Sequence, residues 1–349
     1  MPLKILAFGA GAIGTYIGGS LAISGNSVTF LERPEVAASL SQRGLRLKLG
    51  DQEHRIETPH LASSIEEALQ QRPFDAAIFA LKSFDTALMI QALLPYRDGL
   101  PPIVCLQNGV ENEAHLAQAL GEGQVIAGTV TSAIGRQAAG DIVLERLRGM
   151  GIAAGHPIST ELVQACAQAG LNARLYPSAA EMKWSKMLTN LLANASSAIL
   201  NMKPGEIFNH PGLYRLEIEQ LRETLRVMRA RQIEVVDLPG TAVRALAFAV
   251  LRLPAGLSRP LLRKAVQGGR GEKMPSFYID MKSGRGQTEV DWLNGAVVRY
   301  GKLLGVPTPV NQLLTETLQA MTSGALPLDS FARNPERLLQ SLKKDQLSG

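Results

Sequence analysis

The sequence contains few cysteines for its length, since only Cys105 and Cys166 occur among 349 residues. Two thiols in so long a chain exclude a disulfide framework, and both lie in patterns typical of buried core thiols. The N-terminal residues lead into an expected strand and a glycine motif and lack the pattern of a signal peptide. We therefore expect a reducing, cytoplasmic setting.

Several motifs that carry catalysis are also missing. None of the five histidines belongs to a motif, and the sequence has no H-E-x-x-H, C-x-x-C, G-x-x-x-x-G-K-[ST] or G-x-S-x-G pattern. These absences leave metal-dependent hydrolysis, P-loop phosphate chemistry and elbow-type acyl transfer without support. We expect no metal ion in the functional site.

The charge and the hydropathy argue against two further classes of partner. Lysine and arginine number 36 against 31 acidic residues, and the formal net charge of +5 lacks the strong basic excess of nucleic-acid-binding proteins. The longest apolar stretch, residues 245–257, is interrupted by Arg252 and Pro254 and is too short to span a bilayer. We therefore expect neither nucleic acid as a partner nor a membrane span.

What is present indicates two globular domains. Hydrophobic residues make up 46% of the chain, and at roughly 150 residues per domain the length fits two domains. In the first half, short apolar runs alternate with helical patterns, which predicts βαβ units and a parallel sheet. These runs cover residues 3–8, 27–32, 75–81, 102–107 and 124–130.

The pattern changes in the middle of the chain. Residues 141–147 and 150–155 predict an antiparallel hairpin, followed by a helix and by a last strand that ends at Tyr176. Beyond this strand the periodicity is helical. The sequence thus predicts an α/β Rossmann-type dinucleotide-binding domain over residues 1–180 and an all-α domain over residues 181–349.

A glycine motif of the form G-x-G-x-x-G follows the first expected strand and opens a helix. Its residues are Gly9, Ala10, Gly11, Ala12, Ile13 and Gly14. In this context the first glycine permits a tight turn, and the second lets the backbone approach a pyrophosphate. The third lets the helix pack closely on the strand. The motif therefore predicts a bound dinucleotide.

The end of the second expected strand bears on which dinucleotide is bound. Glu32 is suited to the ribose 2′-hydroxyl of NAD, whereas the adjacent Arg33 is suited to the 2′-phosphate of NADP. Lys82, after the 75–81 strand, supplies a second cation for the same phosphate, or else is a solvated loop lysine. The sequence offers both signals, and the two cations favour NADP.

Polar residues recur along an otherwise apolar helical pattern in the second domain. Lys186, Asn190 and Asn194 are spaced i, i+4 and i+8, which places them on one face of a single expected helix over residues 184–200. Asparagine is unfavourable inside a helix, so this face predicts the wall of a polar pocket. A satisfied core network and a solvent-exposed face are the alternatives.

Two other segments are less specific. Glu289 lies in the first turn of a helix expected within residues 286–295, where a carboxylate either serves chemistry or complements the helix dipole. Residues 238–273 mix proline, glycine and basic residues. They predict a basic, partly amphipathic surface segment, and a contact with a membrane surface or a partner is the alternative.

Taken together, four motifs resemble those of the ketopantoate reductase family over nearly the whole chain. They are GAGAIG at 9–14, LQNG at 106–109, KWSKMLTNLLAN at 183–194 and PSFYIDMKSGRGQTEVDWLNG at 275–295. The resemblance implies an NADPH-binding Rossmann domain and a helical domain like the C-terminal domain of 6-phosphogluconate dehydrogenase. It also implies that a small 2-keto acid binds between the two.

The resemblance further assigns roles to individual residues. It makes Lys186 and Glu289 catalytic, and it makes Asn108, Asn190, Asn194 and Ser276 substrate-binding. For the cofactor it implies the six residues of the glycine motif together with Arg33, Lys82, Asn108, Ile134 and Glu289. It thereby resolves the choice at residues 32–33 in favour of NADP.

The implied activity is the reduction of 2-dehydropantoate to pantoate in pantothenate and coenzyme A biosynthesis. The hydride would come from nicotinamide C4 and the proton from Lys186. An ammonium group suits this step because negative charge develops on the ketone oxygen, and a nearby Glu289 would keep that ammonium charged. A reductase of another 2-keto acid and a non-catalytic dinucleotide-binding regulator are the alternatives. A homodimer is an open expectation.

Overall fold

The computed structural model describes residues 1–71, 73–270 and 273–347, with the side chains of 265–270 and 343–347 outside that description. The chain divides into two compact units, of which unit 1 comprises Met1–Lys183 with Leu238–Thr241. Unit 2 comprises Trp184–Asp237 and Ala242–Gly349. The sequence predicts the boundary after residue 180, and the division observed here lies three residues later, inside a helix.

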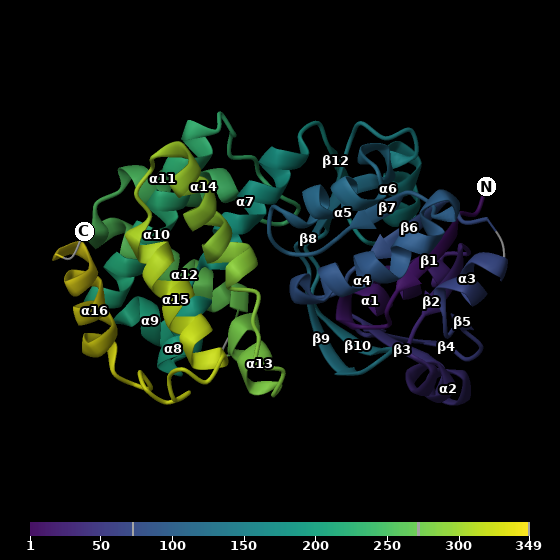
Figure 1. Cartoon of the computed structure of the whole chain (residues 1–349), viewed down its shortest axis with the longest axis horizontal. Helices are drawn as coiled ribbons and strands as arrows, with labels where there is room; N and C mark the ends of the chain where they lie inside the picture. Colours follow the sequence, from purple (N-terminus) through teal and green to yellow (C-terminus); the bar gives the residue numbers. More distant parts are fainter. Residues whose placement is uncertain (72, 271–272, 348–349) are drawn as a thin grey trace. The chain divides into compact units, whose positions relative to one another are not determined.

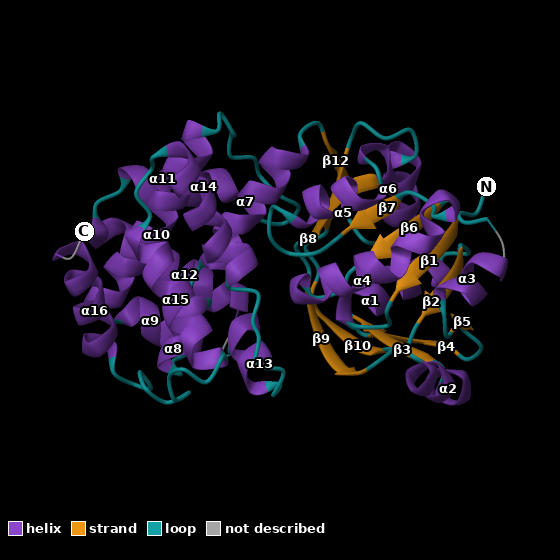
Figure 2. Ribbon diagram, in the orientation of Figure 1, coloured by secondary structure: helices purple, strands orange, loops and turns teal. Residues whose placement is uncertain are grey.

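Unit 1 is built on an eight-stranded sheet in the order β12-β11-β8-β7-β6-β1-β2-β5, which Figure 2 shows in orange. All neighbouring strands are parallel except the antiparallel pair of β8 and β11. The bounds are β1 Lys4–Phe8, β2 Ser27–Leu31, β5 His60–Ala62, β6 Ala76–Phe79, β7 Ile103–Cys105, β8 Val125–Val130, β11 Met150–Ala153 and β12 Ala173–Tyr176. The parallel sheet predicted from the apolar runs is thus confirmed.

Helices cover both faces of this sheet. The central strand β1 has apolar side chains on both sides, and both sets are buried only if each face is covered. Along β1, Ile5 and Ala7 belong to one core cluster while Leu6 and Phe8 belong to another. The α-helices of unit 1 are α1 Ala12–Ile23, α2 Pro34–Arg43, α3 Ile65–Gln71, α4 Thr86–Leu93, α5 Asn112–Leu120 and α6 Ser159–Gln168. Short 3₁₀ turns occur at η1 Ser83–Asp85, η2 Leu94–Gly99 and η3 Glu122–Gln124.

A second, four-stranded sheet of order β4-β3-β10-β9 corrects the expected hairpin. Its strands are β3 Leu45–Leu49, β4 Gln52–Ile56, β9 Ala133–Ala138 and β10 Asp141–Arg146. The antiparallel partner of β10 is β9, while β11 pairs instead with β8 and β12 in the large sheet. The prediction that 141–147 pairs with 150–155 is therefore wrong. Gly140, at φ +67°, makes the turn between β9 and β10.

Unit 2 is helical, as the sequence predicts (Figure 1). Its first helix is α7 Ala179–Leu191, within which the division of the chain falls. The others are α8 Ala195–Leu200, α9 Pro204–Asn209, α10 Pro211–Ala230, α11 Val243–Arg252, α12 Ala255–Arg270, α13 Ser276–Lys282, the π-helix η4 Asp291–Gly295, α14 Ala296–Leu304, α15 Pro309–Thr322 and α16 Pro335–Leu347.

The single helix expected over residues 184–200 is also corrected. The structure has two helices there, α7 and α8, because Ala193 adopts a left-handed conformation at φ +46°. Asn194 is consequently the N-cap of α8 and does not continue the helical face of Lys186 and Asn190. The break changes what Asn194 can contact.

Candidate active site

The glycine motif forms the turn between β1 and α1 in unit 1. Gly9 has φ +90°, and a Cβ at Gly14 would lie 2.0 Å from the carbonyl oxygen of Gly9. The chain itself therefore requires glycine at both positions. At Gly11, by contrast, φ is −70° and a Cβ would meet nothing within 4 Å. The space beside Gly11, at the N-terminus of α1, fits a pyrophosphate bound by backbone amides.

The residues after β2 and β6 adjoin this turn, because β1 lies between these two parallel strands. The Ala10 amide donates a 2.5 Å hydrogen bond to Oε1 of Glu32. Leu81, which precedes Lys82, lies 3.4 Å from the Cβ position of Gly9. The Arg33 side chain is exposed and that of Lys82 is half-buried. The structure thus brings the acid against the glycine turn and places both cations on its neighbouring loops.

Asn108 follows β7, the next strand of the same sheet. Its carbonyl oxygen accepts hydrogen bonds from Ser83 Oγ at 3.1 Å and from Asn112 Nδ2 at 2.7 Å. The side-chain Nε2 of Gln107 donates to the Leu81 carbonyl oxygen at 3.1 Å. These bonds join the loops after β6 and β7 at the carboxyl edge of the sheet, where ligands of open α/β folds bind.

Lys183 is a buried lysine that the sequence analysis did not assign. Its Nζ lies 2.6 Å from Glu113 Oε1 and donates to the carbonyl oxygens of Gln107 at 2.6 Å and Gly128 at 3.3 Å. Lys183 therefore holds the residue before Asn108 in place. Cys105 lies beside this group, and burial raises the pKa of its thiol. The only sequence signal was the position of Lys183 in the KWSK run.

Ile134 is the remaining residue that the resemblance assigns to the cofactor in unit 1. It lies in β9, is half-buried and packs against the core cluster that includes β1 and α1 residues. The strand β9 packs against α1, the helix that starts at the glycine turn. Its backbone contact with a cofactor stays a prediction.

In unit 2, Lys186 and Asn190 lie one turn apart on α7 and are both half-buried. The side chain of Asn194, which is 3% exposed, donates a 3.1 Å hydrogen bond to the carbonyl oxygen of Asn190. The helix break therefore folds Asn194 back onto the end of α7. The two asparagines remain neighbours, although the expected continuous helix is absent.

Asn194 also joins this segment to Ser276, eighty-two positions further along the chain. Its Nδ2 donates to Ser276 Oγ at 3.2 Å, and its Oδ1 accepts from the Phe277 amide at 3.1 Å. The second bond satisfies a backbone amide in the first turn of α13, which has no acceptor within the helix. Asn194 thus fixes the position of the Ser276 hydroxyl.

A buried carboxylate, Glu217 of α10, stabilises the helix break. It accepts hydrogen bonds from the Ala193 amide at 2.7 Å, from Ser196 Oγ at 2.5 Å and from Gln220 Nε2 at 2.6 Å. Because the Ala193 amide would otherwise be buried without an acceptor, Glu217 offsets the cost of the left-handed residue. No local sequence pattern marks Glu217, since the Ala193 amide and the Ser196 hydroxyl that it accepts from lie more than twenty residues away.

Gln220, one turn along α10 from Glu217, reaches a second segment of the site. Its Oε1 accepts a 3.1 Å hydrogen bond from Asn294 Nδ2 in the π-helix η4. Glu289, two residues before η4, is 2% exposed, whereas Asp291 forms a 2.9 Å ion pair with Arg299. The two carboxylates therefore differ: Asp291 is a surface ion-pair partner, and Glu289 is buried.

Neither a metal site nor a membrane span emerges from the described part of the chain. Within residues 1–71, 73–270 and 273–347, no three His, Cys, Asp or Glu residues are grouped as metal ligands would be. Within the same ranges, no helix has the length and apolar character needed to cross a bilayer.

Comparisons with known proteins agree with this architecture. The family model described as ketopantoate reductase PanE/ApbA matches residues 5–155, and the model of its C-terminal domain matches residues 178–322. A 2-dehydropantoate 2-reductase of Pyrococcus horikoshii is 28% identical over 328 residues, which cover 92% of this chain and 98% of that protein.

Solved structures give the same picture. A PanE/ApbA family ketopantoate reductase from Ralstonia eutropha JMP134 is 25% identical, with a TM-score of 0.77 over 92% of this chain and 99% of that one. The ternary structure of D-mandelate dehydrogenase with NADH and anilino(oxo)acetate is 23% identical, with a TM-score of 0.74 over 92% and 99% of the two chains. The second likeness concerns the fold alone.

Proposed function

The chain belongs to the ketopantoate reductase family, and from this premise we propose that it reduces 2-dehydropantoate to pantoate with NADPH. Membership confirms the fold class and the oxidoreductase class expected from the sequence, and NADP as the cofactor of the family. The substrate, the mechanism and the roles of individual residues are the content of the proposal.

The observation that supports the proposal best is the hydrogen-bonded group of Asn190, Asn194 and Ser276. A 2-keto acid presents a carboxylate and a ketone oxygen, both of which accept hydrogen bonds. Hydroxyl and amide groups supply donors without adding charge. Through its bonds to the Asn190 carbonyl oxygen and the Ser276 hydroxyl, Asn194 holds that hydroxyl at the end of the helix that carries Lys186 and Asn190.

In the proposed mechanism, NADPH supplies the hydride when bound. The Lys186 ammonium stabilises the negative charge that develops on the ketone oxygen and then donates a proton to it. Glu289, a buried carboxylate of the same unit, provides the counter-charge that keeps Lys186 protonated. Ser276 binds the substrate carboxylate, and Asn190 and Asn108 orient the rest of the molecule.

For the cofactor, the open space at Gly11 takes the pyrophosphate, and Arg33 and Lys82 take the 2′-phosphate. Glu32 opposes a phosphate here, because it is negatively charged and its carboxylate accepts from the Ala10 amide within the glycine turn. We therefore expect a higher kcat/KM with NADPH than with NADH, and we expect Glu32 to reduce the ratio of the two values.

The test follows NADPH oxidation with ketopantoate, with NADH and a panel of other 2-keto acids run in parallel. We expect ketopantoate with NADPH to give the highest kcat/KM. A higher kcat/KM with another 2-keto acid would show that this acid is the substrate, and the proposed reduction with NADPH would still hold. NADPH binding without turnover of any acid would leave a non-catalytic regulator. The proposed setting is the cytoplasm, in pantothenate and coenzyme A biosynthesis.

A variant separates catalysis from binding. Lys186→Met removes the proton donor and is expected to lower kcat by about a hundredfold or more, while NADPH binding stays nearly intact. Lys302→Met is the matched control, since Lys302 is an exposed lysine on α14 of the same unit. Full activity in Lys186→Met would refute the mechanism.

A further inference from the structure

The segment from Leu238 to Gly271 contains no acidic residue and six basic ones. The bases are Arg244, Arg252, Arg259, Arg263, Lys264 and Arg270. Most of the segment forms α11 and α12, two consecutive helices of unit 2 that pack against each other. Neither helix contributes a residue to the proposed reaction, so the strong positive charge needs another explanation.

The exposed side of α11 combines large apolar side chains with arginines. Phe248 is 60% exposed and Leu251 is 52% exposed, while Arg244 and Arg252 are exposed on the same side. At about 100° per residue these four positions fall within roughly 100° of one helix face. An exposed face of this composition is typical of helices that lie in a membrane interface.

The next helix repeats the combination. On α12, Leu257 is 60% exposed and Leu261, one turn later, is 58% exposed. Lys264 is exposed on the same side, whereas Arg263 is exposed on the other side of the helix, about 120–160° away from the two leucines. Two neighbouring helices therefore both turn leucine or phenylalanine and cations toward solvent, where a folded protein normally places only isolated apolar side chains.

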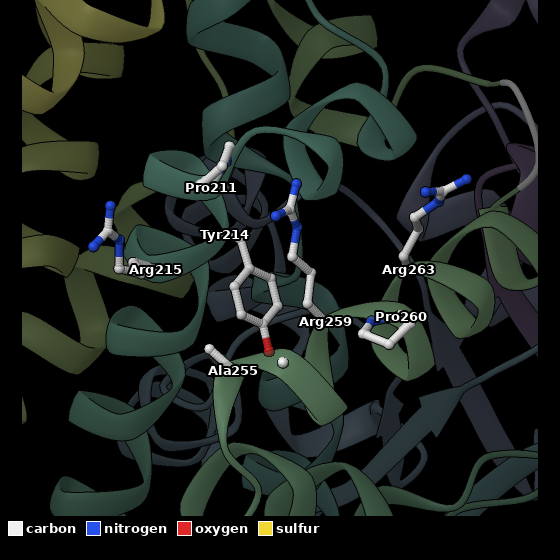
Figure 3. A pocket seen from close by; sticks show the side chains of 8 residues that line it. Pro211, Tyr214, Arg215, Ala255, Arg259, Pro260 and Arg263 are labelled. Atoms are coloured by element: carbon white, nitrogen blue, oxygen red, sulfur yellow. The ribbon is translucent and has the colours of Figure 1, made fainter.

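A shallow hollow of about 510 Å³ beside α12 has three arginines in its lining. In Figure 3, Arg215 and Arg259 lie on either side of the ring of Tyr214, and Arg263 lies farther out, beyond Pro260. Arg259 is held in place, because it donates to the carbonyl oxygens of Phe208 and Asn209 at the end of α9. Among the described residues, Arg215 and Arg263 have no hydrogen-bond or ion-pair partner. The hollow therefore adds two uncommitted cations to this region, on the side of α12 that faces α10 and not on the side of Leu257 and Leu261.

From these features we propose that the exposed sides of α11 and α12 dock this protein on an anionic lipid surface. Phe248, Leu251, Leu257 and Leu261 enter the headgroup boundary, and Arg244, Arg252 and Lys264 lie beside the lipid phosphates. A second copy of the chain fits this surface poorly, because a two-fold contact would bring the same acid-free segments together. The attachment is peripheral, in keeping with the absence of a spanning helix among the described residues.

The experiment is flotation of the full-length protein with vesicles of phosphatidylcholine alone or of phosphatidylcholine mixed with phosphatidylglycerol. We expect binding to the anionic vesicles, little to the neutral ones, and loss of binding in 1 M salt, where the screening length falls to about 3 Å. Equal binding to both kinds of vesicle, or to neither at low salt, would overturn the proposal.

Matched variants locate the surface. Arg252→Gln is expected to weaken anionic-vesicle binding about fivefold, whereas Arg229→Gln, an exposed arginine on α10, leaves it unchanged. Leu251→Ser is expected to weaken it at least fivefold, whereas Leu303→Ser on α14, where the leucine is 78% exposed, leaves it unchanged. Equal losses in test and control variants would overturn the assignment.

Two further measurements keep the result interpretable. All four variants are expected to retain reductase activity and the parent unfolding temperature, because each changes an exposed side chain outside the proposed site. Gel filtration tests whether a second copy of the chain, and not a lipid surface, covers α11. A dimer that Leu251→Ser converts to monomer would show that a second copy covers α11, and would overturn the lipid proposal.

Discussion

Asn194 offers the sharpest test of the site, because one side chain connects three of its segments. In Asn194→Ala, the Asn190 carbonyl and the Ser276 hydroxyl lose a donor, and the buried Phe277 amide loses its acceptor. Two lost bonds cost about 1 kcal/mol each and the orphaned amide about 1–3 kcal/mol, so the unfolding free energy falls by about 3–5 kcal/mol. This is a large part of a typical stability of about 5–15 kcal/mol.

The assay combines thermal unfolding with steady-state kinetics. For a unit of this size each 1 kcal/mol shifts Tm by about 2–4 °C, so Asn194→Ala is expected to lower Tm by roughly 10 °C. At a temperature where the variant is folded, KM for the keto acid is expected to rise more than kcat falls, because the Ser276 hydroxyl is no longer fixed. Asn209→Ala, an exposed asparagine of the same unit, is the control.

A second substitution separates stability from binding. Asn194→Asp keeps an acceptor for the Phe277 amide, and the Ser276 hydroxyl can reverse to donate to the new carboxylate. We therefore expect a smaller loss of Tm than in Asn194→Ala but a larger rise in KM, since the added negative charge repels a carboxylate substrate. If neither variant changes KM, Asn194 does not position Ser276 for substrate, and the reasoning is refuted.

Three other predictions concern unit 1. Glu32→Gln keeps the acceptor for Ala10 but removes a charge opposed to the 2′-phosphate, so the ratio of kcat/KM for NADPH over NADH should rise about tenfold; a fall would mean that Glu32 assists NADPH. Lys183→Met leaves Glu113 unpaired and should lower the unfolding free energy by about 3–5 kcal/mol. Adding Glu113→Gln should recover most of this loss. If urea titrations give the same loss for the single and the double variant, the prediction is wrong. Burial raises the pKa of Cys166 to about 12 and that of Cys105 well above its usual value, so almost no reactive thiolate forms at pH 8; Ellman's reagent should find no fast-reacting thiol before unfolding and two after it.

The parts of the fold that follow from sequence are those in which each segment carries its own signal. The runs that became β1, β2, β6, β7 and β8 are short and apolar because they are buried on both faces of the sheet. Two strands of the second sheet, β3 and β4, lack that signal. β3 reads LRLKL with only alternate positions buried, and β4 reads QEHRI with no buried position. Such strands are identified by their partners, which the sequence does not reveal.

The site shows the same division between local and distant causes. The glycine motif and the Lys186–Asn190 spacing are local patterns, and the structure retains both. The break at Ala193 is not local, because its amide is satisfied by Glu217 on another helix. A periodicity argument therefore extends the helix through Asn194 and misplaces its side chain. Only the family resemblance, which assigns both residues to the substrate, places Asn194 near Ser276; the residue spacing does not.

Gly9, Gly11 and Gly14 show what structure adds to a motif that sequence already identifies. Two of these glycines are explained by the protein alone, one by its positive φ and one by contact with a carbonyl oxygen. Gly11 has neither constraint, and a methyl group there would project into open space. A glycine that folding does not require is best explained by a ligand, because only a bound group would need that space. The dinucleotide site is therefore supported by the middle glycine, and the outer two would be needed in a turn that binds nothing.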